Sequence, residues 1–239
     1  MPENNNISSE ETQLLRFTAR YRLLFKEAAY ALAGSGDMKG TEAALKALTK
    51  RNLLQMHSGQ AALAQNVPFF TLTSLGASTI GAARERSTIS GTSALSTHLG
   101  ILWFTAFAEG VKRKRVENSE ISDGLGGTLH YNNHHVAELQ GSRTIVYRAY
   151  STKATLSNIQ KWAFDTLQGL PTSYKEAVSH GDYGLAVLCE ASTTVEKLKQ
   201  YLQRPYGKNQ RLKNRVRVVV ESAPSTATFP TEYARRFGN

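Results

Sequence analysis

The nine residues YGLAVLCEA at 183–191 restrict the fold more than any other feature of this sequence. Nearly all of them are apolar, with no alternation between apolar and polar positions. A strand solvated on one face alternates in polarity, whereas a strand covered on both faces does not. The stretch therefore predicts a strand inside a layered α/β domain, with other elements packed on both sides of the sheet.

The segments around this strand supply the other elements of such a domain. Alternating polarity predicts two paired strands, GTLHYNNHHVAEL and SRTIVYRAY, joined by a turn at Gly141, and a further strand in NRVRVVVES. Helical spacing predicts helices in LSNIQKWAFDTLQGL, which Gly169 and Pro171 end, and in TTVEKLKQYLQR. We therefore expect a small α/β domain with a mixed sheet over residues 116–222, followed by a C-terminal tail at 223–239.

The N-terminal part predicts helices and a hairpin over residues 10–82, after a disordered, Asn-rich tail at 1–9. Ser8, with Glu11 three residues later, forms a capping box that predicts the start of a first helix. A second short helix, KEAAYALAG, is predicted to end at Gly34. The third helix follows as TEAALKALTKRNLL.

The third helix has two opposite faces when it is drawn at about 3.6 residues per turn. The inner, mainly apolar face comprises Thr41, Ala44, Leu45 and Leu48. The opposite face is cationic and comprises Lys39, Lys46 and Lys50. A helix-turn-helix presents its recognition helix to DNA in this way, after two other helical segments. A solvated lysine face on an ordinary helix is the alternative.

A hairpin is predicted directly after the third helix. LLQMHSGQAALAQNVPFFTLTSLGAS contains a strand, a tip with Gly and Ala, and a returning strand that closes on Gly76. The order of LTKRNLL, a hairpin and FTLTSLG resembles the winged-helix domains of bacterial regulators over about residues 10–82. The resemblance implies that the third helix and the hairpin contact duplex DNA.

Residues 83–115 are predicted to link the two domains. AARERSTISG is a basic connector, and a helix over about 93–111 follows and ends in KRKR. These four cations could offset the helix dipole or contact phosphate. The stretch 91–111 is too short and too polar for a membrane span, because it contains His98, Glu109 and several hydroxyl residues. We expect a buried helix there and no membrane partner.

The charge balance favours a polyanionic partner. The chain has 29 Lys and Arg against 19 Asp and Glu, which gives a formal net charge of +10. A soluble protein that is basic for no functional reason is the alternative. The single cysteine, Cys189, lies in an apolar run, so we expect a core residue in a reducing cytoplasm. MPENNNISSEE lacks the features of a secretory signal, and the expected location is the cytoplasm, with the nucleoid or a plasmid.

The candidate DNA contacts lie in the third helix, the connector, the KRKR run and a basic stretch between Lys197 and Arg217 that has no acidic residue. A loop kept soluble by its charge is the alternative for that last stretch. The candidates are Lys39, Thr41, Lys46, Lys50, Arg51, Arg84, Arg86, Lys112, Arg113, Lys114, Arg115, Arg204, Lys208, Arg211 and Lys213.

The domain order, with a strand running into LCEASTTVEKLKQYLQR, resembles the replication-relaxation family of bacterial plasmids and other mobile elements. In that family a strand ends in an acidic residue, and a polar loop and a helix with Lys and K..Y follow. Glu190, Lys197 and Tyr201 occupy similar places here. The resemblance implies work on plasmid DNA and a C-terminal domain similar to the restriction-endonuclease fold, whose carboxylates and lysine hold Mg²⁺.

The sequence departs from that nuclease pattern. Ser192 stands two residues after Glu190, where a lysine is required, and the chain has no Pro-Asp pair. Under a nuclease alternative with Mg²⁺, the candidate catalytic residues are Glu190, Asp182 and Lys197. With half of the constellation absent, the sequence favours a non-catalytic domain without a cofactor. His130, His134 and His135 lie together but lack the Cys ligands of a structural zinc site, and a solvated hairpin turn is favoured there.

These features together predict a non-enzymatic protein that binds double-stranded DNA of a plasmid or mobile element, either sequence-specifically or structure-specifically. It is predicted to act in replication, maintenance or transcriptional regulation. Two alternatives remain open: a divalent-metal nuclease of restriction-endonuclease-like fold, and a basic adaptor for an acidic protein. Homodimer formation and contacts with replication or mobilisation proteins are also open.

Overall fold

The computed structural model describes residues 7–34, 36–58, 67–88, 91–125, 134–152, 156–190, 192–203 and 216–238. The chain divides into two compact units. The first comprises Met1–Leu102 and Thr226–Asn239, and the second comprises Trp103–Ser225. Helices accompany a two-stranded and a five-stranded sheet, so the mixed α and β class predicted from the sequence is confirmed.

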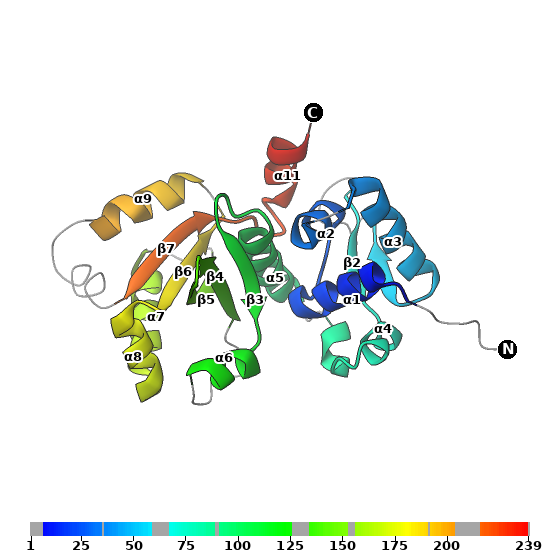
Figure 1. Cartoon of the computed structure of the whole chain (residues 1–239). Coiled ribbons are helices and arrows are strands. Elements are labelled where there is room, and N and C mark those ends of the chain that lie inside the picture. Colours follow the sequence, from blue (N-terminus) through cyan, green and yellow to red (C-terminus); the bar gives the residue numbers. More distant parts are fainter. Residues whose placement is uncertain are drawn as a thin grey trace. The chain divides into compact units, whose positions relative to one another are not determined.

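In the first unit, α1, α2 and α3 precede a short hairpin, and further helices follow it (Figure 1). Its elements are α1 (Ser9–Tyr21), α2 (Lys26–Ala33), α3 (Met38–Lys50), β1 (Leu54–His57), β2 (Phe69–Leu72), α4 (Ser74–Thr79), the 3-10 turn η2 (Arg84–Ser87), the start of α5 (Gly91–Ala106) and α11 (Phe229–Phe237).

Local signals in the sequence explain where the first helices begin and end. The backbone N–H of Glu11 donates to the Ser8 hydroxyl at 3.1 Å, and that of Ser8 donates to the Glu11 carboxylate at 2.9 Å, so the predicted capping box is confirmed. Gly34 ends α2 with a φ of 65°, a conformation that favours glycine. Asp37 begins α3, because its carboxylate accepts the Gly40 N–H at 2.6 Å.

The hairpin is antiparallel and is joined by a third segment. β1 pairs with β2 from Leu54 opposite Leu72 to His57 opposite Phe69. Leu24, between α1 and α2, forms an isolated bridge with Phe70 through two backbone hydrogen bonds of 2.9 and 2.7 Å. This pairing connects the helices to the hairpin within one core, in which Leu24 and Leu45 are fully buried.

The end of the chain, predicted as a tail, forms helix α11 of the first unit instead. The Phe229 ring lies edge-on to Phe25, with 5.2 Å between ring centroids. The Tyr233 hydroxyl donates to the Glu27 carboxylate at 2.8 Å. The aromatic spacing of FPTEYARRF thus belongs to a packed amphipathic helix, whose partners at residues 25 and 27 lie about two hundred positions earlier.

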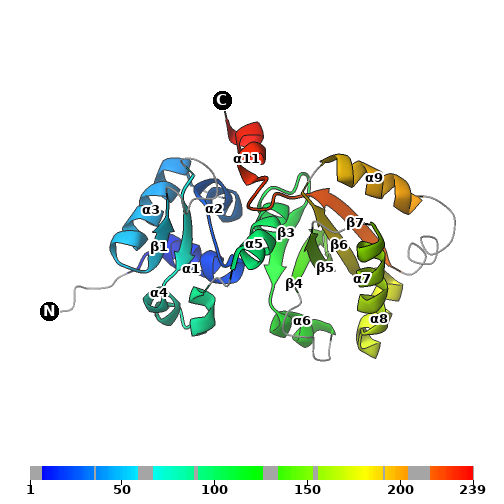
Figure 2. The ribbon, with the colours of Figure 1, turned by 180° about the vertical axis from the view of Figure 1, so that it is seen from behind.

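The second unit is built on a mixed sheet of five strands in the order β3-β4-β5-β6-β7 (Figures 1 and 2). β3 to β5 pair antiparallel, and β5 to β7 pair parallel. The elements are β3 (Lys112–Val116), α6 (Asn118–Leu125), β4 (His134–Gln140), β5 (Arg143–Thr152), α7 (Leu156–Gln168), α8 (Thr172–His180), β6 (Tyr183–Cys189), α9 (Ser192–Gln203) and β7 (Arg217–Ser222). α7 and α8 connect β5 to β6, and α9 connects β6 to β7.

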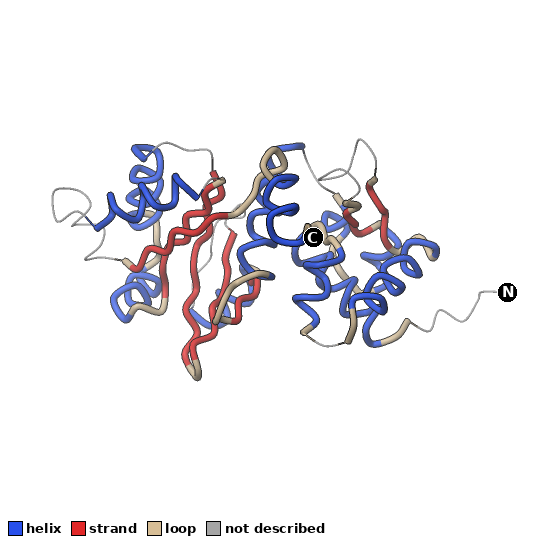
Figure 3. The backbone as a smooth tube through the Cα atoms, turned by 90° about the horizontal axis from the view of Figure 1, so that it is seen from above, coloured by secondary structure: helices blue, strands red, loops and turns tan. Residues whose placement is uncertain are grey.

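β6 is the strand that the run YGLAVLCEA predicted. All seven of its residues are buried, and it lies between β5 and β7. Val187 and Cys189 pack with Ile159 of α7 and with Val195 and Leu198 of α9. Figure 3 shows these helices on one side of the strands. The residues of β6 that face away from these helices are buried as well, so the absence of polar alternation did indicate a strand covered on both faces.

One prediction about the second unit is wrong, and one proline has a second role that was not predicted. KRKR does not end a helix: α5 ends at Ala106, and residues 112–116 form the edge strand β3, because they pair with β4 from Lys112 opposite Leu139 onward. α7 ends at Gln168, just before Gly169 and Pro171 as predicted, and Pro171 is in addition the N-cap of the further helix α8. A proline beside the first turn costs no hydrogen bond, so the same residue can end one helix and begin another.

Helix α5 runs from the first unit into the second, since the boundary between the units falls after Leu102. Its residues from Leu99 to Phe104, apart from the intervening glycine, are buried hydrophobics with at most 6% of their surface exposed. None of the described helices is long and apolar enough to cross a membrane.

Candidate nucleic-acid interface

Helix α3 presents a cationic face to solvent. Its inner residues Thr41, Leu45 and Leu48 are at most 2% exposed, as the helical spacing predicted. The exposed positions on the opposite side are Lys39, Ala43, Lys46 and Lys50. Their spacing of four, three and four residues places them along one stripe of the helix.

Thr41, which was predicted as a DNA contact, does not belong to this exposed face. The side chain is 2% exposed and its hydroxyl donates to the Asp37 carbonyl at 3.1 Å. A threonine in the first turn of a helix commonly satisfies its hydroxyl on the preceding turn. Thr41 therefore helps to anchor the start of α3.

One carboxylate lies beside the cationic stripe. The Lys46 ammonium is 2.7 Å from the Glu42 carboxylate, and Lys26 of α2 is 3.5 Å from its other oxygen. The hydrogen bond from Lys46 and the charge of Lys26 hold the pKa of Glu42 below its usual range. Among the described residues, Lys39 and Lys50 have no ion-pair partner. The stripe thus carries two unpaired cations and one that Glu42 partly neutralises.

Arg51 has a structural partner at the end of α3. Its guanidinium lies 3.2 Å from both oxygens of the Glu11 carboxylate, the same carboxylate that caps α1. Its side chain is 30% exposed. Arg51 therefore ties the end of α3 to the start of α1 and is a poorer candidate for DNA contact than the three lysines.

The FTLTSLG motif fixes the hairpin to the end of α3. The Thr73 hydroxyl donates to the Asn52 carbonyl at 2.7 Å, lies 3.1 Å from the Leu53 carbonyl, and accepts the Gly76 N–H at 2.9 Å. A Cβ atom on Gly76 would lie 2.1 Å from the Leu53 carbonyl oxygen. The motif thus needs a hydroxyl at residue 73 and no side chain at residue 76.

Two predicted contacts lie on η2. Arg84 is exposed and Arg86 is half-buried. The turn is fastened to the end of α1, since the Arg22 guanidinium donates to the Glu85 backbone carbonyl. This contact places the basic connector on the first unit.

The KRKR strand divides its cations between two faces, because strand side chains alternate. Lys112 and Lys114 are exposed, whereas the Arg113 side chain is 5% exposed and Arg115 is 6% exposed. Arg113 and Arg115, which were predicted as DNA contacts, are therefore not on the exposed side of this strand. The Arg115 guanidinium lies 3.2 Å from the Nδ1 atom of His134, a histidine that belongs to β4 and not to a turn.

Arg113 is the centre of a buried charge cluster that the sequence did not predict. Its Nε donates to Glu138 of β4 at 2.8 Å, its two terminal nitrogens donate to Glu221 of β7 at 2.8 and 2.7 Å, and it lies over the Phe104 ring. Burial lowers the pKa of Arg113, but the hydrogen bonds and charges of Glu221 and Glu138 outweigh it, so the net shift is upward.

The contact between Arg113 and Glu221 joins the two edge strands of the sheet. Four strand spacings of about 4.8 Å would separate β3 and β7 by about 19 Å in a flat sheet. A bidentate contact at 2.7 and 2.8 Å therefore requires a strongly coiled sheet. Gly184 of β6 helps to make room on this face, because a Cβ there would lie 3.0 Å from the Tyr147 ring and 2.8 Å from the Arg217 carbonyl oxygen.

The candidate catalytic residues are not brought together. Asp182 precedes β6 and Glu190 follows it, so about 7 residues at about 3.3 Å each separate them along the strand. Asp182 accepts a hydrogen bond from Arg143 at 2.7 Å. Lys197 is exposed on α9. Within the described ranges, no group of three or more His, Cys, Asp or Glu side chains is placed to hold a metal ion.

Arg204, Lys208, Arg211, Lys213 and His130 lie outside the described residues.

His135 is a buried titratable group that the sequence placed in a solvated turn. It is 0% exposed in β4, with its Nε2 atom 3.0 Å from the Tyr183 hydroxyl. Burial, followed by the charges of Arg148 and His134, lowers its pKa to about 3. The ring is therefore neutral when the protein is folded at neutral pH.

This burial predicts a loss of stability in acid. His135 takes up a proton below about pH 6.5 in the unfolded chain, but only near pH 3 in the folded chain. The contribution of neutral His135 to the free energy of unfolding is therefore full above pH 6.5, and it is lost as the pH falls from 6.5 to 3. The free energy of unfolding should fall with decreasing pH by up to about 1.4 kcal/mol per pH unit in this range. Urea unfolding from pH 7 to pH 4 should show a flatter profile for His135→Leu. His180→Gln, an exposed control, should keep the wild-type slope; equal slopes in all three proteins would contradict the prediction.

Comparison of this chain with protein-family models, curated proteins and solved structures finds no match.

Proposed function

We propose that this protein binds duplex DNA through its first unit, as a winged helix with α3 as the recognition helix. Three observations support this interpretation. α3 is the third helix and contacts both α1 and α2. The β1–β2 hairpin follows it directly, as a wing does. The 13 residues of α3 span about 20 Å, a size suited to a helix that lies in a major groove about 12 Å wide.

The cationic stripe of α3 is the observation that carries the proposal. Lys39, Lys46 and Lys50 flank Ala43, whose small side chain allows a close approach to the groove. We further propose plasmid or mobile-element DNA as the natural target, with a role in replication, maintenance or transcriptional regulation. This second step rests on the resemblance of the sequence to the replication-relaxation family.

Neutralising the stripe should weaken DNA binding and reduce its salt dependence. Each phosphate contact contributes about 0.9 to the slope of log K against log salt, so the triple change of Lys39, Lys46 and Lys50 to Ala should lower the slope by about 2 to 3. The change should leave folding intact, because all three side chains are exposed. Fluorescence anisotropy of a labelled duplex across a salt series measures both quantities.

Two further variants sharpen this test. Glu42→Gln should tighten binding, because it removes the carboxylate that neutralises Lys46. The triple change of Lys161, Lys175 and Lys199 to Ala removes three charges from the second unit and should alter the slope less. An equal effect of both triple variants would reject α3 as the interface. An adaptor for an acidic protein predicts no salt-dependent duplex binding at all.

We propose that the second unit does not cut DNA. A hydrolytic Mg²⁺ needs at least two well-placed oxygen ligands from the protein, and the candidate carboxylates of Asp182 and Glu190 lie at opposite ends of β6. Glu138 and Glu221 lie close to each other, but both are bonded to Arg113. Supercoiled plasmid should therefore remain intact with Mg²⁺ or Mn²⁺ on an agarose gel. Nicking that disappears in Glu190→Ala would overturn this.

A further inference from the structure

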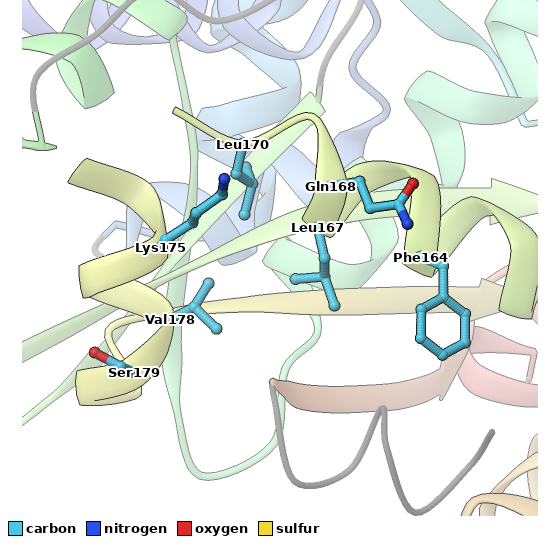
Figure 4. A pocket seen from close by; sticks show the side chains of 7 residues that line it. All are labelled: Phe164, Leu167, Gln168, Leu170, Lys175, Val178 and Ser179. Atoms are coloured by element: carbon cyan, nitrogen blue, oxygen red, sulfur yellow. The ribbon is translucent and has the colours of Figure 1, made fainter. Parts of the chain in front are cut away.

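The second unit has an open groove of about 640 Å³ between α7 and α8 (Figure 4). Leu167 of α7 and Val178 of α8 face each other across it. Phe164 adds apolar surface at one end, and Leu170, in the connection between the helices, adds it at the other. The volume lies within the range of about 300–1,000 Å³ that is typical of small-molecule sites.

The packing of the two helices explains why this surface stays open. Ala163 of α7 and Tyr174 and Ala177 of α8 are buried in the clusters that cover the sheet. Leu167 and Val178 pack against the same clusters but are only partly buried. The inner residues of α7 and α8 thus pack against the sheet, and a second row of apolar residues, which includes Leu167 and Val178, remains partly exposed.

The polar groups of the groove restrict the ligand. Lys175 extends along Leu170 (Figure 4) and has no ion-pair partner among the described residues. The Ser179 hydroxyl already donates to the Glu176 carbonyl at 2.7 Å. Among the described residues that line the groove, one ammonium and the Gln168 amide are therefore the side-chain donors available. A phosphate dianion needs more donors than this, whereas a single carboxylate matches one lysine.

We propose that this groove binds a small amphipathic carboxylic acid, with its aliphatic or aromatic body between Leu167 and Val178 and its carboxylate at Lys175. The site is separate from the DNA interface proposed for α3, and either could exist without the other. Burial of the apolar body supplies affinity, and the single ion pair selects the charge of the head group.

Octanoate, octan-1-ol and octylammonium form a set of probes with one chain length and three charges. Titration of the full chain, followed by ¹H–¹⁵N spectra, should show saturable binding of octanoate with shifts confined to α7 and α8. Octan-1-ol should bind about tenfold more weakly, as expected for loss of one charge-assisted contact, and octylammonium more weakly still.

Two variants separate the roles of charge and shape. Lys175→Met should reduce octanoate binding to the level of octan-1-ol, and Lys161→Met, an exposed control on α7, should have no effect. Val178→Trp should fill the groove and block all three probes. The proposal is overturned if octylammonium binds as tightly as octanoate, if Lys175→Met keeps wild-type affinity, or if octanoate shows no saturable binding below its micelle concentration.

Discussion

Replacing Arg113 by Met is expected to destabilise the second unit by about 3–5 kcal/mol. The change leaves the Glu138 carboxylate, which is 3% exposed, without its nearest cation. Gln140 at 2.6 Å and Arg217 at 3.8 Å still contact this carboxylate, which favours the lower end of the range. The variant also removes the contact with Glu221 that joins the two edges of the sheet. Both tryptophans, Trp103 and Trp162, lie in this unit, so their fluorescence during urea unfolding measures the loss.

Two companion variants test the cause of that loss. Adding Glu138→Gln to Arg113→Met should recover part of the stability, because a neutral amide costs less to bury than an unpaired carboxylate. Lys114→Met is the matched control on the same strand, since Lys114 is exposed and lies 3.9 Å from Glu120, and it should cost under about 1 kcal/mol. If Arg113→Met costs no more than Lys114→Met, the cluster is not what holds the sheet edges together.

Replacing Gly76 by Ala is expected to cost the first unit about 3 kcal/mol or more. The new methyl group would lie 2.1 Å from the Leu53 carbonyl oxygen and 3.1 Å from a Leu72 methyl carbon. Relief requires movement of backbone, and the same Leu53 carbonyl is held by Thr73. A shift of the backbone at Leu53 would also displace the end of α3, so binding of duplex DNA should become weaker as well. Hydrogen exchange of α3, β1 and β2 measures the destabilisation in this unit.

Gly40→Ala is the matched control, because it adds the same methyl group to an exposed position of α3. Its nearest neighbour would be an Asp37 carboxylate oxygen at 3.5 Å, an ordinary contact, and alanine favours a helix over glycine by up to about 1 kcal/mol. This variant should be as stable as the wild type or more so. Faster exchange in Gly40→Ala than in Gly76→Ala would show that the close approach at Gly76 is unimportant.

Elements with a strong local pattern could be predicted from the sequence. The capping box at Ser8 starts α1, the apolar run 183–189 forms β6, and the helical spacing in α3 separates its buried leucines from its exposed lysines. In each case the residues that determine the structure lie within a few positions of one another. Backbone capping, burial on both faces and helical periodicity are local properties.

The elements that were predicted wrongly depend on partners far away in the chain. The sequence KRKR is compatible with the end of a helix as well as with a strand. Only its pairing with β4 determines that it forms a strand. α11 needs Phe25 and Glu27, and a tail is the natural interpretation of FPTEYARRF without them.

The residues of the candidate DNA interface also divide into those that the sequence could place and those that only the tertiary structure could place. The sequence by itself determined that Lys39, Lys46 and Lys50 share the exposed face of one helix, because a period of 3.6 residues is enough to place them. Only the tertiary structure decided which other cations are available. It pairs Arg51 with Glu11 and buries Arg113 between Glu138 and Glu221, while it leaves Lys112 exposed on the same strand. A charge is free or paired according to which carboxylates fold against it, and those carboxylates lie 40, 25 and 108 residues away along the chain.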